Sequence, residues 1–469
     1  MNTIIEVKYP KSMAFVLMLG AFIGLFGETA LNMALTNIIQ EFSVSAATAQ
    51  WLTTGYLLTL GIVIPITALL MRWFFTRQLI FAGLILSVLG SVLAALALNF
   101  PLLLTGRIVQ AIGTGIIIPV MTTAILLIFP IHKRGMVMGI MGLVITMGPA
   151  IGPTLSGLII STLGWPYIFW FSAIFYVLLI AFAAIAIANV GEITKPKIDI
   201  LSIVLSTIGF GGIIYALSTM AELPLSSPVV WGPLLAGIIA LILFGIRQFK
   251  LENPLVNLQV FKYPMYTLGI FMMCLGILVI LSTAILLPLY LRSALLFPAI
   301  IAGLLLLPGN FVNFILSPIV GALFDKFGAR KFIITGFTIV LIGDIIFLSV
   351  ISATTPVWQI VVAFMVLFIG LTMVMMPSQT NALNQLPREL YADGSAAQNT
   401  LNQVAGAAGT AIAITVFTAG QNIFVSGAPN AVEPEIIAAG IKFAFYFITG
   451  ITVIGLICSL FVKKPSKAE

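Results

Sequence analysis

The residues of this sequence with the greatest potential for chemistry are acids placed inside long apolar segments. Only 7% of the residues are charged, and an acidic side chain inside a bilayer costs on the order of 3 kcal/mol. Three acids within or at the end of an apolar segment are selected as candidates: Glu28, Asp344 and Glu222. Glu28 is the strongest candidate, because it follows about 16 residues of its segment, or roughly 24 Å of helix, and so lies near mid-span.

Glu28 could act as a proton carrier. Removal from water favours the neutral form of a carboxyl group, which makes loading and unloading of a proton sensitive to small changes nearby. A cationic compound that approaches Glu28 would compete with that proton, and this competition suffices for exchange if only loaded states of the protein switch. The alternative is that Glu28 only pairs with a neighbouring helix.

Arg107 is the one basic residue placed well inside an apolar segment, at a depth comparable to that of Glu28. Arginine stays charged, so a buried one needs a polar or anionic partner. One hypothesis is that Arg107 adjusts the proton affinity of Glu28 or passes protons on together with Gln110. The alternative is that it donates hydrogen bonds to backbone carbonyls and holds two helices together.

The elements that position these residues are membrane-spanning helices. With 61% hydrophobic residues, the chain has no composition for a soluble surface, and its apolar runs match the roughly 20 residues that cross a hydrocarbon core. Fourteen spans are predicted, at residues 12–39, 48–71, 78–98, 101–128, 135–160, 165–189, 200–220, 229–249, 264–291, 297–323, 331–351, 357–384, 391–420 and 438–462.

The formal charge of +7 is explained by topology. If the N-terminus is cytoplasmic, all Lys and Arg residues lie in or beside cytoplasmic segments except Arg107, Arg292 and Lys442, which leaves 18 of 21. The positive-inside rule therefore places both termini in the cytoplasm. We expect a multi-pass protein of a bacterial-type plasma membrane that contacts the lipid bilayer and needs no nucleic acid.

Two turns with related patterns indicate a duplicated chain. The turn from Gly321 to Lys331 has a counterpart from Thr67 to Arg77, with Met71 at the offset of Asp325. Duplicated halves around a central site are common in secondary transporters. We therefore predict a six-helix bundle at residues 1–190, two inserted helices with linkers at 191–260, and a second six-helix bundle at 261–469.

The later turn resembles the G-x-L-x-D-R-x-G-R-K signature of the major facilitator superfamily, and its earlier counterpart is a degraded copy. Further similarities are an R-x-x-Q-x-x-G pattern at Arg107, a D-x-T-x-x-N-x-A-L pattern in which Glu28 stands one residue after the usual acid position, Gly27, and a G-x8-G-P-x-x-G-P pattern in the fifth span. The residues of this last pattern are Gly139, Gly148, Pro149, Gly152 and Pro153, with Gly157 after them. The sequence is thus similar to the fourteen-helix drug:proton antiporter group, the EmrB/QacA type.

This resemblance implies an all-α major facilitator fold with fourteen transmembrane helices in a 6+2+6 order. It also implies proton-coupled efflux of lipophilic, often cationic small molecules by alternating access, without a cofactor, and we expect a monomer. Export of an endogenous amphiphile such as a lipid or peptide, or a scaffold role without transport, are the alternatives. Enzyme chemistry is not expected, because the single histidine, His132, is far from any paired acid.

Two sets of residues are predicted to carry conformational roles. Small residues allow close helix contact, and proline bends a helix, so the segment from Gly139 to Gly157 is interpreted as a hinge, a packed interface, or both. The second set forms a cytoplasmic latch and consists of Gly321, Asp325, Gly328 and Arg330. With Met71 in place of the acid, the latch at the earlier turn is expected to be weak or absent.

Substrate contacts are expected from polar and aromatic residues that face the cavity. These are Asn32, Trp51, Tyr56, Gln110, Asn310, Asn313, Gln379, Asn399 and Gln403. Polar side chains within spans also serve simply to hold helices together, so this alternative remains open for each of them.

Overall fold

The computed structural model describes residues 7–191, 193–220 and 227–463, with the backbone alone at residues 46, 47, 149, 150, 153, 154, 299 and 300. Over these ranges the chain is helical, without strands. Its first part comprises α1 (Pro10–Ala30), the 3-10 turn η1 (Leu31–Met33), α2 (Leu35–Phe42), α3 (Ala46–Trp73), α4 (Thr76–Ala95), α5 (Phe100–Ile128), α6 (Ile131–Thr162) and α7 (Pro166–Ala186). Glu222 lies outside the described residues.

The remaining elements are also helices. They are α8 (Ile200–Met220), α9 (Pro228–Lys250), η2 (Leu258–Lys262), α10 (Pro264–Leu289), η3 (Tyr290–Ala294), α11 (Ala299–Phe327), α12 (Ala329–Val350), α13 (Val357–Asn384), η4 (Arg388–Leu390), α14 (Tyr391–Gly427) and α15 (Glu433–Ser459). A helix satisfies its own backbone hydrogen bonds, which is the requirement for a chain that crosses lipid.

Thirteen of the described helices are long and apolar enough to cross a membrane. The helix α6 is not among them, although it has 32 residues. It is the element that corresponds to the predicted span at 135–160, so the total of fourteen spans stays a prediction. The protein is a multi-pass membrane protein.

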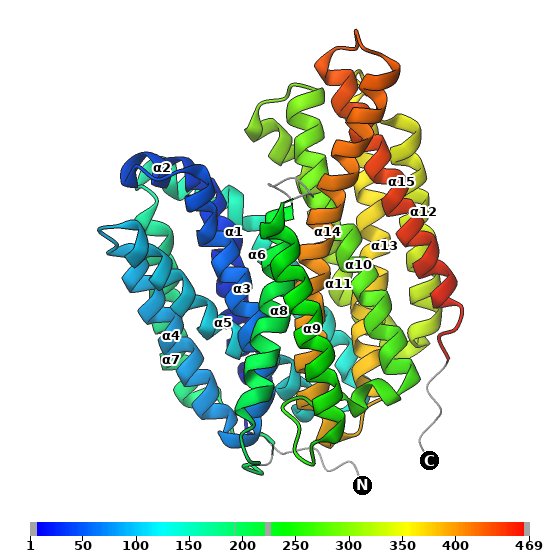
Figure 1. Ribbon diagram of the computed structural model, residues 1–469. Helices are drawn as coiled ribbons and strands as arrows, with labels where there is room; N and C mark the ends of the chain where they lie inside the picture. The colour runs from blue at the N-terminus through cyan, green and yellow to red at the C-terminus, as the bar shows by residue number, and fades with distance from the viewer. Residues whose placement is uncertain (1–6, 192, 221–226, 464–469) are drawn as a thin grey trace.

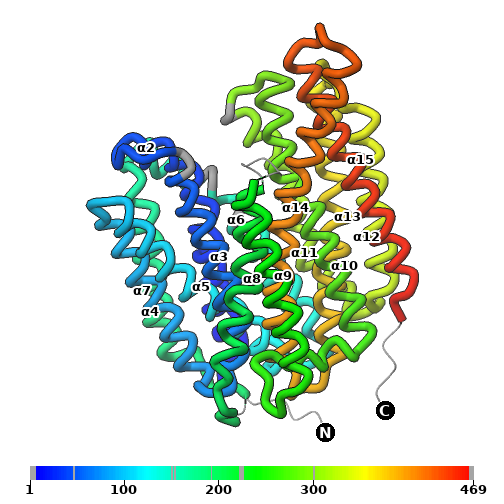
Figure 2. The backbone as a smooth tube through the Cα atoms, in the orientation of Figure 1, coloured from blue at the N-terminus to red at the C-terminus, as the bar shows by residue number. Residues whose placement is uncertain are grey.

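The helices form two groups that meet at one end, as Figure 1 shows. One apolar core joins α1, α4, α5 and α7 with parts of α6 and extends across the junction to residues of α10, α13 and the start of α14, and another joins α10 to α15. The start of α1 and the end of α15 lie at the end where the groups meet, and we call this the basic end because most Lys and Arg residues border it. Toward the opposite end the groups diverge (Figures 1 and 2). The domain limits at residues 190 and 260 remain predictions.

The helices α8 and α9 form a pair beside the junction of the two groups (Figure 1). They pack closely on each other, and α8 contacts both α3 and α14. The pair thus covers one side of the junction, where α3 of the first group meets α14 of the second.

The first predicted span, 12–39, is wrong at its far end. The α-helix α1 ends at Ala30, and the residues from Leu35 to Phe42 form the separate short helix α2. The apolar residues of this helix are at least partly buried and its polar residues are exposed, an amphipathic arrangement that suits the water boundary better than the bilayer core. Glu28 therefore lies in the last turn of α1, and the prediction that it stands at mid-span is also wrong.

Candidate functional site

A buried cluster of polar side chains lies between α1, α3 and α5. Arg107 of α5 is fully buried, and its guanidinium lies over the ring of Tyr56 of α3, 4.2 Å from the ring centroid. Its Nη1 donates to Gln110 Oε1 at 2.7 Å, and Gln110 Nε2 donates to Ser91 Oγ at 3.1 Å. Attraction between the cation and the aromatic face helps to hold a charge at this buried position.

Tyr56 joins this cluster to α1. Its hydroxyl donates to the carbonyl oxygen of Gly24 at 2.9 Å and shares a 2.9 Å hydrogen bond with Thr114 Oγ1. A side chain at Gly24 would collide with Thr114, so the close approach of α1 to α5 requires glycine there. Three helices are thereby fixed around Arg107.

Glu28 lies at the border of the cluster. Its side chain is half-buried, and it is near enough to Arg107 and Tyr56 for electrostatic interaction with both. The carboxylate thus combines partial exposure with a nearby fixed positive charge. A carboxyl group placed in this way can exchange a proton with water while the charge of Arg107 influences its proton affinity.

The position on α1 that faces Arg107 is occupied by Gly27 and not by Glu28. A Cβ atom at Gly27 would lie 3.5 Å from Gln110 Nε2 and 3.8 Å from Arg107 Nη1. The acid thus stands about 100° further around the helix than the position that faces the cation. This offset explains why Glu28 is half-buried while Arg107 is enclosed.

The predicted substrate-contact residues fall into two sets. Five are buried, namely Tyr56, Gln110, Asn313, Gln379 and Asn399, whereas Asn32, Trp51, Asn310 and Gln403 are at least partly exposed. The structure brings Tyr56 and Gln110 together beside Arg107, but the other residues lie elsewhere on several helices.

Several of these residues bond to neighbouring helices. Asn313 of α11 donates to Thr146 Oγ1 of α6 at 2.8 Å and accepts from Thr372 Oγ1 of α13 at 2.7 Å. Asn32 accepts from Thr53 at 2.9 Å, and Asn399 Nδ2 donates to the Ser395 carbonyl of its own helix at 2.8 Å. For Asn313 and Asn32 the alternative of holding helices together fits the contacts directly, whereas the bond of Asn399 stays within α14.

Trp51 also has a neighbour that was not anticipated. Its ring packs on Tyr215 of the inserted helix α8, with 5.6 Å between ring centroids.

The glycines of α6 make two different contacts. A Cβ atom at Gly139 would lie 2.6 Å from the Ser317 carbonyl oxygen of α11, whereas Gly148 and Gly152 approach the backbone of α1. Gly157 has more room, since its Cβ would meet only Met33 Cε at 4.0 Å. The side chains of Pro149 and Pro153 lie outside the described residues. The helix α6 therefore lies between α1 and α11, which suits both a hinge and a packed interface.

The later signature turn connects the two groups at the basic end. Asp325 of α11 accepts from the backbone N–H groups of Gly135 at 2.8 Å and Met136 at 3.0 Å, near the start of α6. A helix N-terminus favours negative charge, so the carboxylate is well placed. Gly321 packs on Gly135, and Gly328 has φ +79°, which favours glycine.

Arg330 of the same turn stays on its own side of the molecule. It is exposed, and its Nη2 lies 3.4 Å from the Leu460 carbonyl oxygen of the second group.

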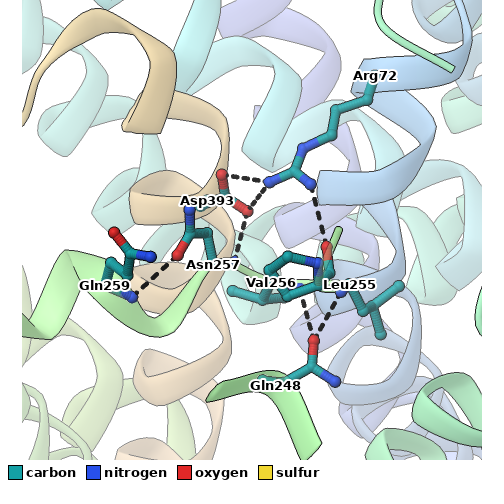
Figure 3. Close-up of polar contacts among 8 residues, drawn as sticks. Arg72, Gln248, Leu255, Val256, Asn257, Gln259 and Asp393 are labelled. Carbon is teal, nitrogen blue, oxygen red and sulfur yellow. Dashed lines mark hydrogen bonds and ion pairs between the residues drawn. The ribbon is translucent and has the colours of Figure 1, made fainter. Parts of the chain in front are cut away.

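The earlier turn makes a contact that the sequence did not predict. Arg72, at the end of α3, forms an ion pair with Asp393 of α14, 2.6 Å from both carboxylate oxygens (Figure 3). Asp393 is fully buried and also accepts from the backbone N–H of Asn257 at 2.8 Å. The expectation that the latch at this turn is weak or absent is therefore wrong, because the acid is supplied by the partner helix.

Arg134 is a second basic residue that crosses between the groups. It is buried at the start of α6, and its Nη1 donates to Asn384 Oδ1 at 3.0 Å and to the Tyr391 hydroxyl at 2.9 Å. Its other guanidinium nitrogens donate to the carbonyl oxygens of Leu126 and Phe129. Arg134 is thus bound by neutral acceptors.

Sequence reasoning missed these residues for an identifiable reason. Arg72 and Arg134 belong to the charge pattern that predicts topology, and Asp393 is not among the acids selected as candidates from the sequence. A signal was available, since Asp393 is an acid two residues inside a predicted span on the same side as Arg72.

The fold and these buried polar groups define a class, the multi-pass membrane transporters built from two groups of helices. The chain belongs to the Major Facilitator Superfamily, whose sequence profile matches residues 17–410. It is 50% identical over 454 residues to the lincomycin resistance protein LmrB of Bacillus subtilis, with 96% of this chain and 95% of that protein covered. It is 51% identical over 450 residues to LmrB of Listeria innocua, with 95% of each covered.

A solved structure shows the same fold at low sequence identity. The proton:xylose symporter XylE superposes with a TM-score of 0.65 at 16% identity, over 97% of this chain and 96% of that one. The recognition of the family and of its drug-efflux type from sequence motifs is confirmed. The chain is accordingly a transporter of this superfamily and not an enzyme, and its LmrB relatives are named for drug resistance.

Proposed function

We propose that this protein exports lipophilic, often cationic compounds in exchange for protons, and that lincomycin is among them. The observation that carries the proposal is the position of Glu28, half-buried at the border of a cluster that contains a buried arginine. The LmrB relatives support the substrate class through their name.

The cluster suggests how the carboxyl group of Glu28 exchanges a proton for a cationic substrate. Arg107 attracts the ionised form of Glu28, whereas burial favours the protonated form. An arriving cation stabilises the carboxylate and displaces the proton, and departure of the cation allows a proton to return. Arg107 and Tyr56 are fixed by hydrogen bonds and packing. The equilibrium between protonated and ionised Glu28 therefore changes mainly when a cation binds to or leaves the exposed side of this residue.

We further propose that the exporter works by alternating access, as a monomer with fourteen spans that include α6. The hydrogen bonds that join the two groups run from the basic end to the Asn313–Thr146 pair, and the groups diverge toward the other end (Figure 1). With the basic end in the cytoplasm of a bacterial-type cell, this arrangement is the outward-facing state.

The proposal is tested with purified protein in proteoliposomes under an imposed pH gradient. Efflux of radiolabelled lincomycin and the internal pH are recorded together. We expect Glu28→Gln to lower proton-coupled efflux by at least about tenfold, because an amide cannot carry the proton, and Glu28→Asp to retain part of the activity.

A matched control is available in the other group of helices. Asp344 of α12 is an acid that is fully buried, accepts from Thr452 Oγ1 of α15 at 2.6 Å and is not part of the cluster. Asp344→Asn should keep the exchange. If Glu28→Gln folds and still exchanges lincomycin for protons at the original rate, the proposal is wrong.

A further inference from the structure

The inserted helices and their linkers form a closed ring of polar contacts with both groups at the basic end. We refer to α8, α9 and the segments beside them, residues 193–220 and 227–257, as the strap. The proposed exchange reaction does not involve the strap. Its contacts, which Figure 3 shows in part, indicate a different role.

The two helices of the strap behave as one unit. Asp199 and Arg247 form an ion pair with atom separations of 2.6 and 2.9 Å, and Gln248 Nε2 donates to Ser202 Oγ at 2.6 Å. The hydrogen bonds from Arg247 and Ser202 lower the pKa of Asp199 to about 2, so this pair remains charged throughout the pH range of transport assays. Further along, Gly212 and Gly237 allow the two backbones to touch.

The segment before α8 is attached to the end of α3. The backbone N–H groups of Thr194 and Lys195 both donate to the Arg72 carbonyl oxygen at 3.1 Å. In addition, Trp73 Nε1 donates to the Pro196 carbonyl oxygen at 3.0 Å. The strap is therefore anchored on the first group of helices.

The segment after α9 reaches the ion pair of the earlier turn (Figure 3). Gln248 Oε1 accepts from Leu255 N at 2.6 Å and from Val256 N at 3.3 Å, which sets the path of this segment. The Pro254 carbonyl then accepts from Arg72 Nη1 at 3.0 Å, and Asn257 N donates to Asp393 Oδ1 at 2.8 Å.

Apolar contacts support the same arrangement. Leu255 and Val256 are buried in one cluster with Ala68 and Leu69 of α3, Phe244 of α9, and Ala396 and Ala397 of α14. The segment thus fills the space between α3 and α14 where these helices end and begin.

We propose that the strap holds α3 and α14 together and keeps the basic end closed, with Gln248 as the residue that positions its clamp. The strap makes more contacts with α3 than with α14. When the basic end opens, the strap therefore stays with α3, and α14 moves away from the two of them. The Arg72–Asp393 pair and the Asn257–Asp393 hydrogen bond then break together. This role rests on the alternating access of the proposed function.

The test measures the distance between α3 and α14 at the basic end, independently of transport. Spin labels are placed on cysteines at the exposed positions Phe75 and Glu389, in full-length protein without Cys274 and Cys458, in nanodiscs. Double electron–electron resonance then gives the populations of the short and long distances.

Two pairs of variants test two separate parts of the strap. Gln248→Ala removes the clamp, whereas Gln259→Ala changes an exposed glutamine of the same region whose side chain is outside the ring (Figure 3). Asn257 has φ −75°, which proline accepts. Asn257→Pro therefore deletes the N–H that binds Asp393, and Asn257→Ala keeps it.

We expect Gln248→Ala and Asn257→Pro to raise the population of the long distance several-fold. The controls Gln259→Ala and Asn257→Ala should show the same distance populations as the parent protein. Melting curves identify any variant that fails to fold, and each pair can be interpreted without the other. If folded Gln248→Ala or Asn257→Pro protein keeps the parent distances, the strap proposal is wrong. Absence of lincomycin efflux by the parent protein would instead overturn the proposed function and leave the distance result intact.

Discussion

Two helix pairs bring the groups together at the basic end, and different chemistry holds each of them. Between α6 and α11 the contacts involve the backbone, because Asp325 accepts from two N–H groups and Ser317 Oγ donates to the Gly139 carbonyl at 2.8 Å. Between α3 and α14 the contact is an ion pair of two side chains, Arg72 and Asp393, supported by the strap.

The difference shows how a duplicated turn can keep a similar role after its acid is lost. Met71 stands where the later turn has Asp325, so the earlier turn has no carboxylate to offer the helix opposite. The acid is found instead on that opposite helix, as Asp393, and the turn contributes Arg72. A contact between long side chains can span a wider gap than packed glycines, but it needs a third element to fix its geometry. The strap is that element here.

The largest effect is expected when one partner of the ion pair is removed. Asp393→Ala leaves Arg72 and the Asn257 N–H without their acceptor and should lower the unfolding free energy by about 3 kcal/mol. This value is at the low end for a buried pair because the Arg72 side chain is 19% exposed and water can solvate it. Unfolding in mixed micelles with a denaturing detergent measures the change.

Exchange of the two charges sharpens this prediction. In the double variant Arg72→Asp with Asp393→Arg, the Pro254 carbonyl would face a carboxylate and the Asn257 N–H would face a guanidinium. The swap should therefore recover less than half of the loss. Full recovery would mean that the pair acts alone, without the strap.

An intermediate effect is expected from a methyl group added between α6 and α11. The Cβ of Gly139→Ala would lie 2.6 Å from the Ser317 carbonyl oxygen, and such overpacking costs about 1–3 kcal/mol. Gly142 is the matched control, because the nearest atoms to its Cβ would be 3.7 and 3.9 Å away. Gly142→Ala should be neutral in the same unfolding assay. Equal losses in the two variants would contradict close backbone packing at Gly139.

The helices could be predicted well from the sequence, because apolar length determines them. The predicted spans 200–220 and 357–384 coincide with α8 and α13. The end of the first span could not be found in this way, since apolar residues continue past Ala30 into α2 and hydropathy does not distinguish a crossing segment from one at the water boundary.

The candidate site could be predicted only in part. The proximity of Glu28 to Arg107 followed from their similar depths, and the contact of Asp325 with a helix end followed from its turn. The pairing of Arg72 with Asp393 joins residues 321 positions apart, and no local pattern specifies such a partner. The role of residues 254–257 was equally hidden, because their backbone groups carry no sequence signal.

The smallest effect is expected for Asp325→Asn, at about 1 kcal/mol of unfolding free energy. The amide oxygen can still accept one of the two N–H groups, and the packed glycines of α6 and α11 remain in place. The loss comes from the second hydrogen bond and from the attraction between the carboxylate and the start of α6. Lys326→Gln, at the neighbouring exposed position, controls for the loss of a charged side chain from this turn and should be neutral. If Asp325→Asn costs as much as Asp393→Ala, charge rather than backbone packing holds both helix pairs, and the contrast between them is not real.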